Sequence, residues 1–413
     1  METKHAGVET SHSLTAAIQM FCAQAALFFL PMPAIKPLGI SLTVADLFLV
    51  PAVLLNLRFA LRLHFFQILL LLALPLNLLS HMLDPGGDLI PLLQMVYLWG
   101  FLVPFGWCAF VTVPKERLAL LLLIGSSLSS VMAMGQFAGF LPVLPTQKVI
   151  ELNVAGGLRA PGLVLQCNSL AMSLTPCFLL LPSIRRASLR VAFTLILFGG
   201  IASTVSKAIV LALPGFLFYF LWREPEKRKV FGGLSVLLLL GVFVLARGEG
   251  VALSLGKLWD TIQYRLTYVD ESVDDRKHLA SMAIKYAGED CWLLGFGTNG
   301  AYEHMRQDRM EQSVHVWYLG MWLVIGAPAL AFTLLAFANV VLTLWRLRQF
   351  NEAIYLLAHL LAICVTTMLY ISYQYAPLVI AATALVRANW EHEQRLLAER
   401  RVRVAGPTAL RRA

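Results

Sequence analysis

Residues 63–82 read LHFFQILLLLALPLNLLSHM, and this stretch decides the fold class. It contains no lysine, arginine, aspartate or glutamate, and its length is about the 20 residues that an α-helix needs to cross about 30 Å of hydrocarbon. In lipid, a segment must satisfy its own backbone hydrogen bonds, so such a run must be helical. Similar runs recur along the chain. The sequence therefore predicts an all-α protein that crosses a membrane many times.

The overall composition agrees with this prediction. Hydrophobic residues make up 58% of the 413 residues and charged residues 14%, whereas a soluble domain has roughly 45–50% and about 25%. The first dozen residues are polar and precede no convincing cleavage site, so we interpret the first apolar run as a span rather than a removed signal. Twelve spans are predicted, at residues 15–34, 38–57, 63–82, 90–112, 118–141, 164–183, 189–205, 207–222, 230–246, 314–345, 352–371 and 373–389.

The basic residues indicate how these spans are oriented. With the N-terminus placed in the cytoplasm, every inner connection carries lysine or arginine, and the short outer connections hold only four: Lys36, Lys148, Arg159 and Lys207. Twelve spans with both ends inside explain this asymmetry. The basic tail, residues 390–413, is then interpreted as a surface next to anionic membrane lipid. It is not interpreted as a nucleic-acid arm, although the net charge is +9.

One connection differs in kind from the others. Residues 247–313 are polar and rich in both charge signs, and they separate nine spans (1–246) from the last three (314–389). A structureless loop of this length would be unusual. Ser272 and Asp275 match a capping box, and apolar residues then recur at helical spacing, at Leu279, Met282, Ala283 and Tyr286. We predict a small extracytoplasmic helical cap on the outer ends of the spans.

The end of this loop carries the pattern G-x-G-x-x-G at Gly295, Gly297 and Gly300. The pattern implies dinucleotide binding only after a strand in a βαβ unit, and here it follows a helical segment outside the membrane. A glycine turn that re-aims the chain is the favoured interpretation. The six cysteines show no metal-ligand spacing and are interpreted as small apolar residues.

His315 lies where the loop re-enters the membrane. Such a histidine is often only an interfacial polar residue. Basic residues nevertheless gather on the same predicted side, and a neutral imidazole among fixed cations suits general-base work on a phosphate-bearing substrate. These residues are Arg159, Lys207, Arg265, Arg276, Arg306 and Arg309.

Other polar residues lie near or within the predicted spans, and Lys207 and Asp46 have two interpretations each. Lys207 follows Ser203, Thr204 and Ser206, which makes a plausible anion site at a helix N-terminus, but it could equally extend to the interface. Asp46 is predicted to lie mid-span, where a structural partner is favoured over catalysis. Asn168, like Arg159, lies at the entry to the sixth span and alone says little.

Four blocks together resemble the O-antigen ligase and polymerase family of membrane glycosyltransferases. GLRAPGLVLQCNSLA (157–171) resembles its R-x-x-G…N entry to a span, and STVSKAIVLALP (203–214) its T-x-S-R block, with Lys207 where arginine is usual. DDRKHLASMAIKYAGEDCWLLGFGTNG (274–300) resembles the block that supplies Arg276, Gly295 and Gly297. In SVHVWYLGMWLVIGAPALAF (313–332), His315 and Gly326 keep the spacing of the ligase signature, although Val316 replaces its amide or hydroxyl residue.

The resemblance implies a GT-C-like fold and a function at the periplasmic side of a bacterial inner membrane. A ligase transfers a glycan from undecaprenyl diphosphate to a sugar hydroxyl of lipid A–core, whereas a polymerase transfers it to another lipid-linked repeat. The histidine-to-glycine spacing favours the ligase. A lipid-linked glycan transporter or flippase is an alternative of another class, although the sequence shows no internal repeat of the kind that such proteins often carry.

The resemblance also implies roles for individual residues. His315 would be the general base, and Arg276, Arg159, Lys207 and Arg265 would bind the diphosphate, with Asn168, Gly295, Gly297 and Gly326 in support. Fixed cations would stabilise the charge that develops on the leaving diphosphate. No carboxylate cluster suggests a metal, so we expect no cofactor, and direct attack would invert the anomeric centre.

Overall fold

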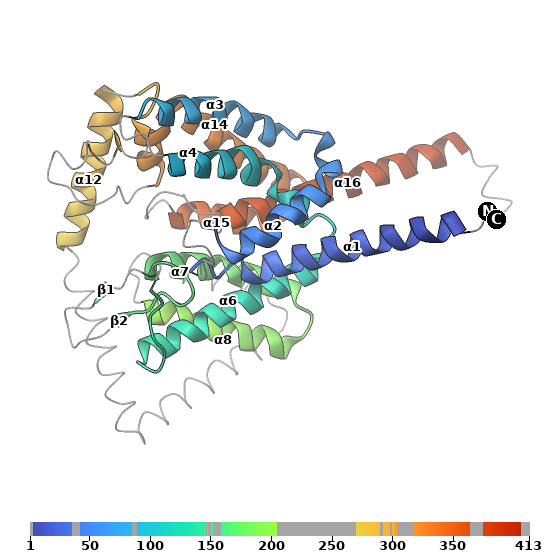
Figure 1. The fold of residues 1–413 in the computed structure, drawn as a ribbon, viewed down its shortest axis with the longest axis horizontal. Helices are drawn as coiled ribbons and strands as arrows, with labels where there is room; N and C mark the ends of the chain where they lie inside the picture. The colour runs from blue at the N-terminus through green and yellow to red at the C-terminus, as the bar shows by residue number, and fades with distance from the viewer. Residues whose placement is uncertain are drawn as a thin grey trace, which may run out of the picture.

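The computed structural model describes residues 3–34, 42–84, 89–145, 147, 150–151, 158–204, 270–289, 292–297, 300–301, 303, 317–363 and 375–405. Over these residues the chain is almost wholly helical, and most helices run alongside one another (Figure 1). Helix α12 (Asp270–Glu289) lies across one end of the bundle, here termed the α12 end. Helices α1 (Thr3–Phe29) and α16 (Ala376–Ala405) project from the opposite end, termed the α1/α16 end.

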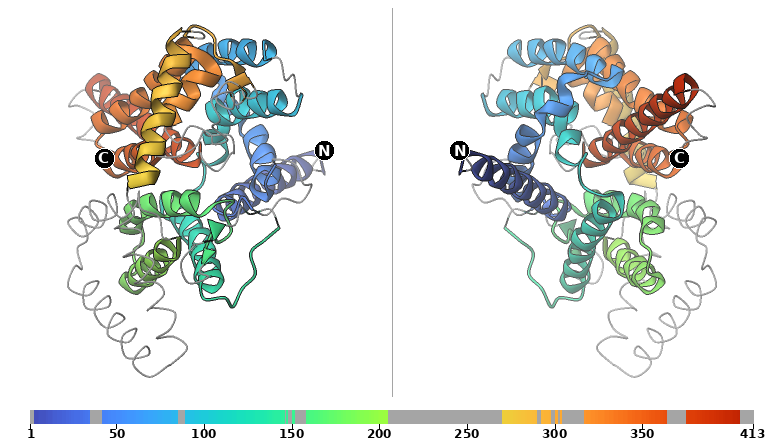
Figure 2. Two further views of the ribbon diagram at one scale, coloured as in Figure 1. Left: turned by 90° about the vertical axis from the view of Figure 1, so that its left-hand side faces the viewer. Right: turned by 90° about the vertical axis from the view of Figure 1, so that its right-hand side faces the viewer.

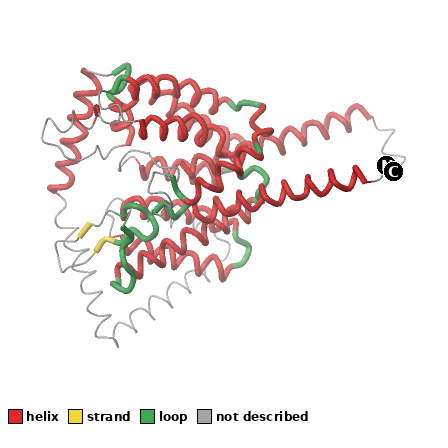
Figure 3. Tube along the Cα trace, viewed as in Figure 1, coloured by secondary structure: helices red, strands yellow, loops and turns green. Residues whose placement is uncertain are grey.

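The remaining elements follow in chain order. They are α2 (Val44–Leu55), η1 (Leu57–Leu61), α3 (Phe65–Met82), α4 (Leu89–Met95), η2 (Val96–Leu102), α5 (Val103–Phe105), η3 (Gly106–Ala109), α6 (Lys115–Phe137), β1 (Ile150–Glu151), β2 (Leu158–Arg159), α7 (Cys167–Leu174), η4 (Thr175–Ser183), α8 (Ala187–Thr204), α14 (Trp317–Arg346) and α15 (Phe350–Ile363). The two short strands pair antiparallel, with Ile150 opposite Arg159, and lie near the α12 end (Figure 3).

Five segments of the described chain are long and apolar enough to cross a membrane: Phe65–Met82, Leu92–Ala109, Lys115–Phe137, Ala187–Thr204 and Trp317–Arg346. Leu14–Phe29, Val44–Leu55 and Cys167–Ser183 are shorter and also apolar. The membrane-protein prediction is supported to this extent. Ten of the predicted spans contain helix in their described part. The predicted spans 207–222 and 230–246 lie outside the described residues, so the number twelve stays a prediction.

Both ends of the chain depart from the predicted boundaries. Helix α1 begins within the polar N-terminal residues, and α16 continues from the last predicted span through most of the predicted tail. The helix thus continues past residue 390, and the division between the last span and the basic tail stays a prediction. No glycine or proline occurs between Leu378 and Ala405, so nothing in the sequence stops the helix there. Arg395 and Glu391 add an i,i+4 ion pair on its exposed face.

Predicted inner connections meet near the α1/α16 end. The residues before α6, the end of η4, and Gln349 between α14 and α15 all border one cavity there. Lys115 pairs with Glu352, and Arg185 lies 3.0 Å from Glu116. Because these connections share one end and α12 lies at the other, the arrangement is compatible with the predicted orientation.

The core brings segments together that are distant in sequence. Helix α3 packs along α14, α1 along α2, and α6 along α8. At the last contact a Cβ on Gly200 would lie 2.4 Å from the Ser130 hydroxyl, so glycine permits the close approach that is typical of membrane helix pairs. Cys22, Cys108, Cys167 and Cys177 are buried free thiols, as predicted for small apolar residues.

Asp46 lies at a different place in its helix than predicted, but it has the structural partners that were predicted for it. It lies in the first turn of α2 rather than mid-span. Its carboxylate accepts hydrogen bonds from the Thr43 backbone N–H (2.7 Å) and hydroxyl (2.8 Å), which makes a capping box. The Tyr97 hydroxyl donates a further bond of 2.7 Å to the other carboxylate oxygen. The structural interpretation of this buried carboxylate is therefore confirmed.

Candidate functional site

The candidate site lies at the α12 end, to which three separate parts of the chain contribute. They are the 159–168 segment with the end of α8, the 292–300 segment with α3 and α14, and α12 itself. In Figure 2 (left) α12 crosses this end of the molecule in front of the other helices. The first two parts can be built from described side chains.

Arg159 is the best-defined basic residue of the site. Its side chain is only 6% exposed. The Nε group donates to the Thr204 carbonyl at 3.1 Å, and Nη2 donates to Asn168 Oδ1 at 2.5 Å. The backbone N–H of Ala160 donates to the Ser203 carbonyl at 3.2 Å. The structure thus joins two of the four blocks, because Arg159 and Asn168 belong to the first and Ser203 and Thr204 to the second.

Two oxygen atoms, the Thr204 carbonyl and the Asn168 side-chain oxygen, accept hydrogen bonds from the Arg159 guanidinium. A buried charge is costly unless such bonds compensate for the water that it loses. These two bonds therefore help to explain why a cation can be buried here. Its planar fork is held by a carbonyl on one side and an amide oxygen on the other, so the charge has a fixed place and orientation.

Gly162 shows why the first block needs a glycine. Its φ is +64°, and an added Cβ would lie 2.4 Å from the Ser129 carbonyl oxygen of α6. Its N–H donates to Gln136 Oε1 at 2.8 Å, and its carbonyl accepts from Gln147 Nε2 at 2.7 Å. These contacts hold the turn that follows Arg159 against α6. They therefore help to fix the position of the Arg159 guanidinium.

Gly326 breaks helix α14. Its φ and ψ are 79° and 166°, which are not helical. Pro328 follows and has no N–H, so the Val324 carbonyl loses its usual partner; the Ser80 hydroxyl of α3 donates to it instead. The predicted span 314–345 is thus two helical pieces joined at Gly326 rather than one continuous helix.

The segment after α12 fills the break in α14. The Phe296 N–H donates to the Leu323 carbonyl at 2.7 Å, and the Ala327 N–H donates to the Trp292 carbonyl at 2.8 Å. An added Cβ on Gly326 would lie 2.3 Å from the Leu293 carbonyl oxygen. The backbone groups that the break releases are therefore satisfied by residues 292–296 within the described structure.

The glycine pattern serves this close docking. An added Cβ on Gly295 would lie 2.1 Å from the backbone of Val324, and one on Gly297 (φ +73°) would lie 2.6 Å from the Asp84 side chain. The Gly297 N–H donates to the Ser80 hydroxyl at 3.1 Å, and the Gly300 N–H donates to Asp84 Oδ1 at 3.0 Å. The predicted glycine turn is confirmed, and over the described residues the pattern follows helix α12 rather than a strand.

Helix α12 confirms the predicted helical loop and corrects its start. Leu279, Ala283 and Ala287 are buried on the face that meets α14. The described part of the helix already includes Asp270, so Ser272 lies within the helix rather than at its cap. Arg276 lies in the first half of this helix, and its side chain is outside the described part of the structure.

The other predicted site residues fall outside the described residues. These are His315, Lys207 and Arg265, together with Arg306 and Arg309. His315 precedes the start of α14 by two residues, and Lys207 follows the described end of α8 by three. Their roles stay predictions.

Ser80 and Asp84 are site residues that sequence reasoning missed. Both are buried at or just beyond the end of α3, and both hold the glycine segment. The signal was present in HMLDPGGD (81–88), where a carboxylate follows a long apolar run. A buried carboxylate needs hydrogen-bond donors, and backbone N–H groups of a glycine-rich segment are suitable ones.

Over the described residues, no three histidine, cysteine, aspartate or glutamate side chains gather so that they could hold a metal ion. The prediction of metal-independent chemistry stays a prediction. No known protein-family model matches the chain, and no curated protein gives a significant match. The functional argument therefore rests on the residues themselves.

Proposed function

We propose that this protein is a membrane glycosyltransferase of the O-antigen ligase type. It would transfer a glycan from undecaprenyl diphosphate to a sugar hydroxyl of lipid A–core on the periplasmic face of the bacterial inner membrane. Its GT-C-like architecture would have twelve spans, both termini in the cytoplasm, and residues 247–313 as the periplasmic loop. The α12 end would then be the active end of the molecule.

The observation that carries the proposal is the junction of Arg159, Asn168 and the end of α8. These groups lie in two sequence blocks that resemble separate motifs of the family, and they form one hydrogen-bonded cluster. Burying a cation inside a membrane protein is expensive and marks a functional site by default. A fixed guanidinium near the end of a span suits a lipid diphosphate, whose phosphates lie at the membrane surface.

The proposed reaction is a single displacement at the anomeric carbon. His315 accepts the proton of the acceptor hydroxyl as its oxygen attacks the anomeric carbon. The bond between that carbon and the diphosphate oxygen breaks with inversion, and undecaprenyl diphosphate leaves with the electron pair. Arg159, Arg276, Lys207 and Arg265 would stabilise the negative charge of this leaving group. No metal or other cofactor is required in this scheme.

The break in helix α14 bears on the alternative that the protein is a transporter. Discontinuous helices often mark ion or substrate sites in transporters, because their free backbone groups face the ligand. At Gly326 those groups are instead bonded to residues 292–296 and Ser80. The break thus serves to dock the segment that follows α12, which favours the glycosyltransferase over the flippase.

Deletion of the gene followed by gel analysis of lipopolysaccharide tests the proposal. A ligase predicts uncapped lipid A–core together with accumulated lipid-linked polymer. Capping by a single repeat would instead indicate a polymerase. Unchanged lipopolysaccharide would contradict the proposal. Complementation with the wild-type gene is the matched control, and with Arg159→Ala it should fail to restore capping although the protein is inserted.

A further inference from the structure

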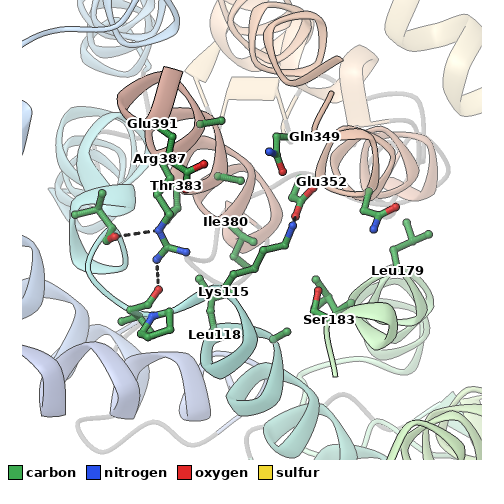
Figure 4. Close-up of a pocket in the computed structure, with 18 of the residues that line it drawn as sticks. Lys115, Leu118, Leu179, Ser183, Gln349, Glu352, Ile380, Thr383, Arg387 and Glu391 are labelled. Atoms are coloured by element: carbon green, nitrogen blue, oxygen red, sulfur yellow. Dashed lines mark hydrogen bonds and ion pairs between the residues drawn. The ribbon is translucent and has the colours of Figure 1, made fainter. Parts of the chain in front are cut away.

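A second site lies near the α1/α16 end, far from the glycosyl-transfer site. A cavity of about 450 Å³ opens between the start of α6, the end of η4, the start of α15 and the middle of α16 (Figure 4). This volume lies within the usual range of sites that bind small molecules. The proposed topology places the cavity at the cytoplasmic surface of the membrane.

The wall of the cavity has two kinds of lining. Toward the bundle it is apolar, with Leu118, Leu179, Leu180 and Ile380. Around the charged residues lie Thr112, Ser183, Gln349, Asn351 and Thr383. A cavity that is apolar on one side and polar on the other, at the level of lipid headgroups, matches an amphiphile better than a soluble metabolite.

Arg387 supplies a fixed cation to the cavity. Its Nε donates to the Val111 carbonyl at 2.9 Å, and its Nη2 donates to the Phe110 and Val113 carbonyls. Its remaining nitrogen, Nη1, makes no hydrogen bond with a described residue, and in Figure 4 it is turned toward Lys115 and Ile380. The guanidinium is thus anchored by two nitrogens and presents the third to a ligand, which suits a phosphate oxygen.

Carboxylates balance the cations around the same cavity. Lys115 is paired with Glu352, whose side chain is 10% exposed. Glu391 lies four residues after Arg387 on the same helix face, and its only described ion pair is the exposed one with Arg395, at 3.8 Å. Two cations and two carboxylates line one cavity. A purely anionic headgroup would be repelled by the two carboxylates. A zwitterionic headgroup, with one negative and one positive group, can interact favourably with the cations and with the carboxylates.

We propose that this cavity binds a phospholipid with a phosphoethanolamine headgroup from the cytoplasmic leaflet. The phosphate faces Arg387 Nη1 and Lys115, the primary ammonium donates to Glu391, and part of an acyl chain lies along the apolar wall. The proposal depends on the predicted topology and not on the glycosyl-transfer activity.

The test is the binding of added lipid to the purified full-length protein in detergent, by native mass spectrometry and thermal unfolding. Dioleoyl phosphatidylethanolamine should bind roughly three- to tenfold more tightly than the matching phosphatidylcholine, whose quaternary ammonium cannot donate a hydrogen bond. The matching phosphatidylglycerol should also bind more weakly. Soluble O-phosphoethanolamine should give no stabilisation at the same concentration, because it lacks the acyl chain.

Two variants and one control make the result decisive. Glu391→Gln should remove the preference for phosphatidylethanolamine over phosphatidylcholine, and Ala384→Leu, which fills the cavity, should weaken both lipids. Glu393→Gln removes a similarly exposed carboxylate that pairs with Arg62 outside the cavity, and it should change neither. Equal binding of the three lipids, an unchanged preference in Glu391→Gln, or stabilisation by O-phosphoethanolamine alone would overturn the proposal. Lipid binding and thermal unfolding are measured without glycosyl transfer. Their outcome therefore does not depend on whether the proposed function is correct.

Discussion

Substitution of Gly326 by alanine should uncouple the 292–297 segment from α14. The native φ of 79° and ψ of 166° lie in a region that is essentially restricted to glycine, and this strain costs about 1–3 kcal/mol. The new Cβ would also meet the Leu293 carbonyl oxygen at 2.3 Å. That oxygen belongs to backbone rather than to a flexible side chain, so the segment must move away.

The movement should break the two backbone hydrogen bonds that join Phe296 to Leu323 and Ala327 to Trp292. Each is worth about 0.5–1.5 kcal/mol. Together with the strain, the free energy of unfolding should fall by about 2–6 kcal/mol. Glycosyl transfer should fall with it, because the displaced segment leads toward the start of α14 and His315.

Gly139→Ala is the matched control for this variant. Gly139 also has a φ of 79°, but no atom lies within 4 Å of its added Cβ. Its cost should therefore be the backbone strain alone, about 1–2 kcal/mol. The assay is equilibrium unfolding of the purified proteins in one detergent, together with hydrogen exchange at the Phe296 amide. Equal losses in the two variants, or unchanged protection of Phe296 in Gly326→Ala, would refute the docking argument.

Three further predictions follow from the site and the topology. Arg159→Lys should weaken donor binding by about tenfold, and Arg159→Ala should weaken it further. The reason is that one ammonium cannot contact both Thr204 and Asn168 as the guanidinium does. Donor affinity equal to that of the wild type in the lysine variant would contradict this role of the guanidinium. EDTA should leave the rate of glycosyl transfer by the purified enzyme unchanged. Activity that requires added magnesium or manganese would show that arginine and lysine side chains alone do not stabilise the leaving diphosphate. A cysteine introduced at position 308 should react with a membrane-impermeant thiol reagent in intact spheroplasts and one at 405 should not, and the reverse labelling would invert the topology.

Much of the architecture could be predicted because hydropathy is a local property. The run at 63–82 corresponds to α3, and the run at 118–141 to α6. The periodicity at Leu279 and Ala283 correctly gave the buried face of α12. In each case the residues that carry the signal are also the ones that make the contacts.

The errors have different origins. Asp46 was placed mid-span because the apolar run around it was read before its local cap with Thr43, three residues earlier; only the bond from Tyr97 comes from another segment. The break at Gly326 needs the 292–297 segment and Ser80 to satisfy its backbone, and neither is near in sequence. The extension of α16 was missed because charge, which ends a membrane span, does not end a helix.

The candidate site was predictable to the same degree. The resemblance singled out Arg159, Asn168 and the block that contains Thr204, and these meet in the structure. It also singled out glycines whose added Cβ atoms would collide with backbone or with Asp84. Ser80 and Asp84 belong to none of the four blocks; the carboxylate after the apolar run marks Asp84 in the sequence, but its partners appear only when α3 packs against α14.

In vitro transfer by purified wild-type protein and His315→Ala tests the central claim most directly. The substrates are an undecaprenyl-diphosphate-linked glycan and lipid A–core, and donor binding is measured beside turnover. Base catalysis typically contributes about 10²–10⁴-fold in rate, so His315→Ala should lose about that much turnover while it keeps its affinity for the donor. Turnover near that of the wild type, or a loss of donor binding as large as the loss of turnover, would contradict the account.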